Sequence, residues 1–260
     1  MSELEVRKDK WADVKQWFIE KRAQTVIDNL KKNYMNGFYV PTREEAIKKI
    51  MDMIEAELPE GGTIGWGGSV TLRNMGILYD LQKSGKYQCL NPFRGLVSKK
   101  EKHVARVWMD VAGALEKTMD AWRKCLSADV YLTSTNAITL KGALVNCDGY
   151  GNRVAAMMFG PKKVIVVTGY NKIVKDIPEA LERVKNIVTP KLVKMMAGEP
   201  REGEEKFFPP CVRLGRCAGD PRTLRGCGAA YRACGMTSII EQPHTPDRIT
   251  VIIVGEELGF

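Results

Sequence analysis

Apolar positions at helical spacing run through the first sixty residues of the chain. The first stripe predicts a helix from about residue 11 into the thirties, which ends at Asn36-Gly37. A second predicted helix begins at a Thr-x-x-Glu capping box formed by Thr42 and Glu45 and ends at Pro59. The apolar positions are Trp11, Val14, Phe18, Val26 and Leu30 in the first stripe and Ala46, Ile47, Ile50, Met51, Ile54 and Leu58 in the second.

Beyond residue 62, short apolar runs of strand length alternate with amphipathic stretches of helix length. A hairpin is expected to interrupt this order, because Leu144–Asn146 leads to turn residues at Asp148-Gly149 and residues 154–159 return. The alternation predicts an α/β fold with a largely parallel sheet flanked by helices. The expected strands are 63–66, 87–90, 129–133, 164–168 and 248–255, and the expected helices are 70–83, 99–126 and 177–196, the last kinked near Pro190.

This pattern divides the chain into four segments. Residues 1–62 form a helical segment packed on the core, and residues 63–198 form the α/β core. Residues 199–246 open with a charged, proline-bearing linker and continue as a loop-rich, cysteine-containing excursion. Residues 247–260 supply a last strand that is expected to return to the core sheet.

Composition and charge narrow the class of protein. Apolar residues make up 44% of the chain, no apolar run is long enough to span a membrane, and the first residues are charged throughout, so we expect a cytoplasmic protein. The formal net charge of +9 comes from scattered basic pairs, which favours a solvated surface over a field that attracts anionic substrates. Nucleic-acid binding is not favoured, because the sequence contains no nucleic-acid motif.

A glycine-rich turn joins the expected strand 63–66 to the helix that follows. In GWGGSVT, backbone N–H groups at a helix start can hold an anion, so Gly67, Gly68, Ser69 and Thr71 are candidate binding residues. The alternative is a tight turn in which Ser69 is only the helix N-cap. The spacing is neither a Walker loop nor a complete dinucleotide fingerprint.

A second polar segment, residues 133–153, follows the expected strand 129–133. Ser134, Asn136, Asn152 and Arg153 are candidate ligand-binding residues, since hydroxyl, amide and guanidinium groups at strand ends suit small anions. Asp148 is the candidate general base. The alternatives are a hairpin turn at Asp148-Gly149 and a structural salt bridge for Arg153.

Four cysteines fall within the excursion of residues 199–246. With no secretion signal, such a cluster favours a metal or redox site over disulfides. Zinc and an iron–sulfur cluster both suit four thiolates, although the spacing has no Cys-x2-Cys step, and reduced free thiols are the alternative. The candidate ligands are Cys211, Cys217, Cys227 and Cys234.

The chain resembles the LUD domain family, the lactate-utilization proteins. The resemblance rests on GWGGSVTLRNMGI (65–77), on the long block SADVYLTSTNAITLKGALVNCDGYGNRVAAMMFGPKKVIVVTGYNKIV (127–174) and on RITVIIVGEELGF (248–260). It implies a Rossmann-like core related to ribose-5-phosphate isomerases and CoA transferases, with the Gly65–Ser69 turn and the Thr133–Arg153 segment lining one pocket. Relatives often carry a tighter cysteine cluster, whereas here Asp220 stands three positions after Cys217.

The resemblance implies a role beside iron–sulfur subunits in lactate oxidation, and three hypotheses follow. The chain binds a small anionic metabolite as an enzyme or enzyme subunit, it is a metal- or iron–sulfur-binding partner of an oxidoreductase, or it is a ligand-sensing module without turnover. A homodimer is expected only by analogy with the fold.

Overall fold

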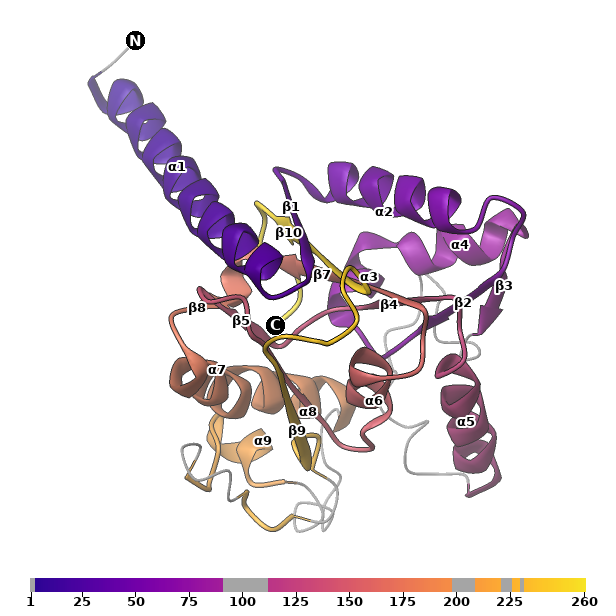
Figure 1. Ribbon diagram of the computed structural model, residues 1–260. Coiled ribbons are helices and arrows are strands. Elements are labelled where there is room, and N and C mark those ends of the chain that lie inside the picture. The colour runs from indigo at the N-terminus through magenta and orange to yellow at the C-terminus, as the bar shows by residue number, and fades with distance from the viewer. Residues whose placement is uncertain (1–2, 91–111, 198–208, 221–225, 230–231) are drawn as a thin grey trace.

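The computed structural model describes residues 3–90, 112–197, 209–220, 226–229 and 232–260. Its centre is a six-stranded sheet in the order β1-β10-β7-β4-β2-β3, in which every neighbouring pair is parallel (Figure 1). The predicted α/β fold with a mostly parallel sheet is therefore confirmed. The strands are β1 (Asn36–Val40), β2 (Thr63–Trp66), β3 (Gln88–Leu90), β4 (Val130–Thr133), β7 (Lys163–Gly169) and β10 (Ile249–Val254).

The strand order places a topological switch point between β2 and β4. From β2 the chain moves outward to the edge strand β3, whereas from β4 it moves the other way to β7. Loops that leave a parallel sheet in opposite directions open a crevice at the carboxyl ends of the two strands, where such folds bind ligands.

One face of the sheet is covered by α2 (Arg43–Glu57), α3 (Val70–Met75) and α4 (Ile77–Ser84). The predicted capping box starts α2, because the Thr42 hydroxyl accepts a hydrogen bond from the backbone N–H of Glu45 at 3.3 Å. The single helix expected over 70–83 is broken at Gly76, whose φ of 79° is left-handed and ends α3.

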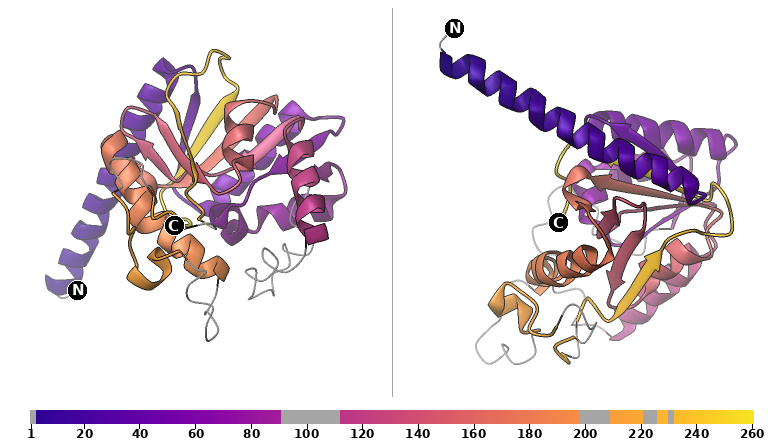
Figure 2. Two further views of the ribbon diagram at one scale, coloured as in Figure 1. Left: turned by 90° about the horizontal axis from the view of Figure 1, so that it is seen from below. Right: turned by 60° about the vertical axis from the view of Figure 1, so that its left-hand side comes forward.

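The other face is covered by α1 (Glu3–Lys32), α5 (Ala112–Cys125) and α6 (Asn152–Met158). The second half of α1 packs through Val26 and Leu30, which are fully buried. Its first half projects away from the body (Figure 2), and the apolar residues that suggested a core stripe there are exposed, Trp11 by 73%. The predicted helix over 99–126 is described only for α5, since residues 91–111 lie outside the described residues.

A second sheet has four strands in the order β8-β5-β6-β9. Its strands are β5 (Ala137–Thr139), β6 (Leu144–Asp148), β8 (Ile173–Val174) and β9 (Met236–Ile240), and the cysteine-bearing excursion contributes β9. The predicted hairpin with its turn at Asp148-Gly149 is wrong: the antiparallel pair is β5 with β6, and its turn lies at residues 140–143.

The expected return strand at 154–159 is wrong, because these residues belong to α6. Asp148 accepts a hydrogen bond from the backbone N–H of Val154 at 2.8 Å, which satisfies a donor in the first turn of the helix. Gly151, with a φ of 78°, turns the chain into it. A short apolar run such as VAAMMF does not by its periodicity distinguish a strand from a buried helix.

The helix expected over 177–196 is built from three pieces. These are α7 (Ile177–Arg183), a π-helical turn η3 (Val184–Val188) and α8 (Thr189–Ala197). The wider π turn ends two residues before Pro190. Proline has no backbone N–H to donate to the carbonyl four residues back, and its ring clashes with that carbonyl in a regular α-helix. A short 3-10 turn, η2 (Tyr170–Lys172), and a short helix, α9 (Cys211–Leu214), complete the described elements. Among these elements there is no helix with the length and apolar character that crossing a lipid bilayer requires.

Candidate functional site

Three loops meet at the carboxyl ends of β2, β4 and β7. The loop after β2 leads into α3, whose second residue is Thr71. The loop after β4 carries Ser134, and the segment after β7 forms η2, which ends in Lys172. The Lys172 amino group donates hydrogen bonds to the Thr71 hydroxyl at 2.9 Å and to the Ser134 hydroxyl at 3.0 Å. The Ser134 hydroxyl donates to that of Thr71 at 3.3 Å. The two sequence segments predicted to meet thus do so, through Thr71 and Ser134.

Lys172 is the central cation of this cluster and was not predicted from sequence. Its side chain is only 4% exposed, and within the described part of the chain it forms no ion pair. Burial, together with the positive charges of Arg183 and Arg153, lowers the pKa of its amino group to about 7. An ammonium held among hydroxyls without a carboxylate is suited to receive an anion from outside.

Sequence did contain one signal for Lys172. It lies in GYNKIV, directly after the apolar run of β7, and polar residues at the carboxyl end of a parallel strand are candidates for a site. The lysine follows Gly169, Tyr170 and Asn171, which are also typical of a turn, so the sequence alone does not distinguish it from a surface lysine.

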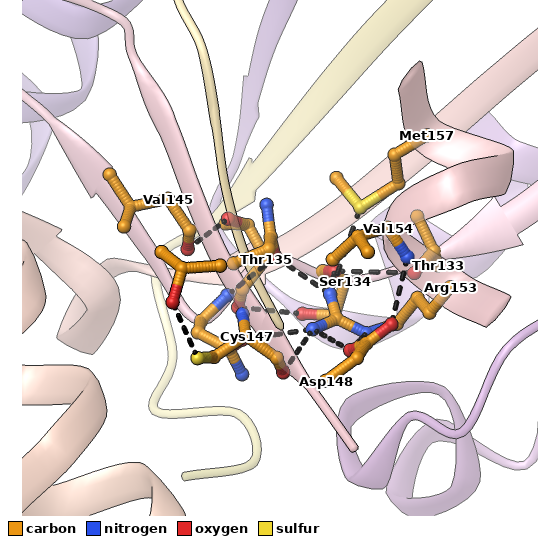
Figure 3. Close-up of polar contacts among 12 residues, drawn as sticks. Thr133, Ser134, Thr135, Val145, Cys147, Asp148, Arg153, Val154 and Met157 are labelled. Carbon is orange, nitrogen blue, oxygen red and sulfur yellow. Dashed lines mark hydrogen bonds and ion pairs between the residues drawn. The ribbon is translucent and has the colours of Figure 1, made fainter. Parts of the chain in front are cut away.

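Arg153 lies in a buried network beside this cluster (Figure 3). All five of its N–H donors have protein acceptors. A ligand could therefore bind this guanidinium only by replacing one of these protein acceptors. It forms an ion pair with Asp148 at 2.7 Å, and both side chains are buried. Its acceptors are Asp148 Oδ1, the Ser134 carbonyl, Asn146 Oδ1, Asn136 Oδ1 and the Cys147 carbonyl, at 2.6 to 3.1 Å.

Asp148 and Asn136 are also held by protein groups. One carboxylate oxygen of Asp148 accepts from Arg153 and the other from the Val154 N–H, so both have partners. The Asn136 side-chain oxygen accepts from the Cys147 N–H at 2.8 Å as well as from Arg153. This network fixes the backbone of residues 134–136 and thereby the direction of the Ser134 hydroxyl.

The glycine-rich turn packs against the same network. A Cβ at Gly67 would lie 2.6 Å from the Tyr131 hydroxyl and 2.9 Å from Arg153 Cγ, so only glycine allows this approach. Ser69 is the N-cap of α3, since its hydroxyl accepts from the Leu72 N–H at 3.2 Å. Gly68 is exposed, and Asn152 is half-buried at the first residue of α6.

The last residues of the chain cross over the Lys172 cluster. The Thr71 hydroxyl donates to the Leu258 carbonyl at 3.4 Å, and the Leu258 N–H donates to the side chain of Asn171 at 3.2 Å. Gly259 approaches so closely that a Cβ there would lie 3.3 Å from Lys172 Nζ. Farther back, Glu256 forms an ion pair with Arg43 at 2.7 Å. Residues 256–259, the C-terminal tail hereafter, therefore shield the amino group from water.

Within the described residues, the four cysteines of the excursion have free thiols and do not form a ligand set. Burial, together with the neighbouring thiols of Cys227, Cys234 and Cys217, raises the pKa of the Cys211 thiol to about 11. No three Cys, His, Asp or Glu side chains in the described stretches come together closely enough to hold a metal ion. The described arrangement therefore does not itself form a zinc or cluster site.

Comparison with known proteins identifies the family. The LUD domain matches residues 23–254, which is most of the chain. A crystal structure at 1.70 Å resolution of a DUF162 family protein from Deinococcus radiodurans is similar at 17% identity, over 83% of this chain and 100% of that chain, with a TM-score of 0.28. No curated protein matches the sequence. On the match of residues 23–254, the chain belongs to the LUD domain family, which is associated with lactate utilization.

Proposed function

We propose that this chain binds a small organic anion, of the class of 2-hydroxy and 2-oxo acids, as a component of a lactate or 2-hydroxy-acid oxidation system. The observation that supports it is the buried amino group of Lys172, which contacts the hydroxyls of Thr71 and Ser134 and has no carboxylate partner among the described residues. A carboxylate is the ligand that such a group lacks.

The position of the cluster supports the same proposal. It lies at the switch point between β2 and β4, where open parallel sheets bind small ligands. In the loop before α3, the Gly67 N–H already donates to the Leu132 carbonyl at 3.4 Å, so Gly68, which is exposed, is the remaining predicted contact on that side. In this proposal Asp148 and Arg153 hold the loop after β4 in place. A catalytic role for Asp148 stays a prediction.

A thermal-shift series tests the proposal directly. L-lactate, pyruvate, a phosphosugar and a CoA thioester are added separately to the full chain, and a ligand that binds the folded state raises the melting temperature. We expect the two small acids to stabilise the wild type and to have no effect on Lys172→Met. Lys185→Met is the matched control, because Lys185 is also buried but donates to the Cys234 carbonyl, away from the cluster. A wild type that no small acid stabilises would overturn the proposal.

Turnover separates a catalytic subunit from a sensing module. An acid that binds is supplied with an artificial electron acceptor and, separately, with an oxidoreductase fraction that contains iron–sulfur subunits. Product formed only when the oxidoreductase fraction is present together with the chain supports a role as a component of an oxidation system. Binding without product in either sample supports a ligand-sensing module.

A second proposal concerns the four cysteines of the excursion, which fall within 24 residues of the sequence and all have free thiols. We propose that Cys211, Cys217, Cys227 and Cys234 bind zinc or an iron–sulfur cluster after the loops of the excursion bring the thiols closer together. Anaerobic purification followed by elemental analysis tests this. Zinc or iron in a fixed ratio to the chain would support it, and titration of all thiols in a metal-free protein would exclude it.

A further inference from the structure

The surroundings of Lys172 suit an amine that is neutral as well as one that is charged. Its nitrogen is desolvated, and the positive charges of Arg183 on α7 and Arg153 on α6 act on it. Desolvation and neighbouring cations are the two conditions that turn a lysine into a nucleophile near neutral pH. An amine needed only for charge would gain from a nearby carboxylate, and the described residues supply none.

The hydrogen bonds at Lys172 are compatible with the neutral form. A neutral amine has two N–H groups and one lone pair, and the two hydroxyl partners, Thr71 and Ser134, use two hydrogens. The neutral amine therefore keeps both contacts and retains its lone pair for a third direction. The C-terminal tail lies over the cluster, and Gly259 has no side chain to fill the space beside the nitrogen.

We propose that Lys172 captures the carbonyl group of a small 2-oxo acid as an imine, an inference that rests on the proposed binding of such acids at this cluster. The neutral amine attacks the carbonyl carbon and forms a carbon–nitrogen bond, while the carbonyl oxygen takes up a proton. The carbinolamine then loses its hydroxyl as water, and a carbon–nitrogen double bond remains. One water leaves for each imine formed, and its return releases the acid unchanged.

The neighbours of Lys172 supply the groups that this step needs. The hydroxyls of Thr71 and Ser134 both contact the nitrogen and each other, so they can carry the proton from the nitrogen to the departing oxygen. The charges of Arg183 and Arg153 favour an anionic acid over a neutral ketone. A 2-hydroxy acid has no carbonyl carbon to attack, so the chemistry distinguishes lactate from pyruvate.

Reductive trapping tests the inference on the full chain. The protein is incubated with pyruvate and sodium cyanoborohydride, and peptide mass mapping locates any stable adduct. We expect one dominant adduct at Lys172 in the wild type and in Lys185→Met. We expect none with lactate, and none at this position in Lys172→Met. Trapping should increase as pH rises through neutrality, because the neutral amine is the reactive form.

Failure of this inference differs from failure of the proposed function. If both acids raise the melting temperature of the wild type but no adduct forms at Lys172, the imine is excluded and the anion site stands. If adducts are spread over exposed lysines at equal yield with and without Lys172, the imine is likewise excluded. If neither acid shifts the melting temperature and no adduct forms, both proposals fail. Because the mapping is read within the wild type, the conclusion does not depend on the folding of a variant.

Discussion

At the scale of single residues, Lys172 makes the stability of the fold depend on pH. Its pKa is about 7 in the folded protein and 10.5 in an exposed reference state, so the unfolded chain binds more protons between these values. Stability should therefore rise as pH increases from 7 toward 9, by at most about 1.4 kcal/mol per pH unit from this group. Arg183 and Arg153 are the charged groups that act on it. Burial lowers the pKa of Arg183 only to about 10, so its charge is retained in this range.

Lys172→Met should remove this pH dependence. Urea unfolding of wild type and variant at several pH values between 6.5 and 9 measures it, and the difference between the two proteins isolates Lys172 from other titrating groups. We expect the free energy of unfolding of the variant minus that of the wild type to be largest near pH 7. This difference should fall as pH rises toward 9, because only the wild type gains stability there from Lys172. Parallel pH profiles for the two proteins would contradict the low pKa.

Arg153 is expected to contribute more to stability than to ligand contact. Replacing it by methionine leaves Asp148 buried without its ion-pair partner, which should lower the free energy of unfolding by about 3–5 kcal/mol. Arg123→Met is the control, because Arg123 pairs with Asp120 on the exposed surface and should change stability by less than about 1 kcal/mol. Denaturant unfolding compares the two. Equal, small losses would show that the buried network is not needed for the fold.

At the scale of elements, α1 combines a packed half and a projecting half. Leu30 is fully buried, so Leu30→Ala should lower the free energy of unfolding by about 2–5 kcal/mol. Trp17, exposed on the projecting half, should tolerate replacement by serine within about 0.5 kcal/mol. Thermal or urea unfolding checks the contrast. A large loss from Trp17→Ser would show that the exposed face is covered in solution.

The same helix shows what sequence patterns determine and what they leave open. Helical spacing fixes the element type of α1, but it does not reveal whether other residues cover the stripe. It therefore predicts packing for Trp11, Val14 and Phe18, which the structure leaves exposed. At α6 the apolar run was compatible with either element type, and the deciding contact, from Asp148 to the Val154 N–H, is a local cap that periodicity does not encode. The capping box at Thr42 was predictable because both partners lie within one helical turn.

At the scale of the whole molecule, the candidate site is assembled from residues far apart in the chain. Sequence located the loops after β2 and β4, because polar residues follow apolar runs there. It missed Lys172, and it missed the C-terminal tail, since their contacts join residues up to 213 positions apart, as Arg43 and Glu256 do. Contacts between residues so far apart in the chain arise from the strand order, which brings the carboxyl ends of β2, β4, β7 and β10 to the same end of the sheet.

The C-terminal tail should control access to Lys172. Gly259 and Gly85 both have left-handed backbones, with φ of 66° and 67°, so alanine imposes similar backbone strain of about 1–2 kcal/mol at each. The two glycines differ in the room that they leave for a Cβ atom. A Cβ at Gly259 would lie 2.6 Å from the Thr71 hydroxyl, whereas a Cβ at Gly85 would meet nothing within 4 Å. Gly259→Ala should therefore displace the tail and increase labelling of Lys172 by an amine-reactive probe, followed by mass mapping. Gly85→Ala should leave labelling at the wild-type level, and equal labelling in both variants would show that the tail does not shield the amine.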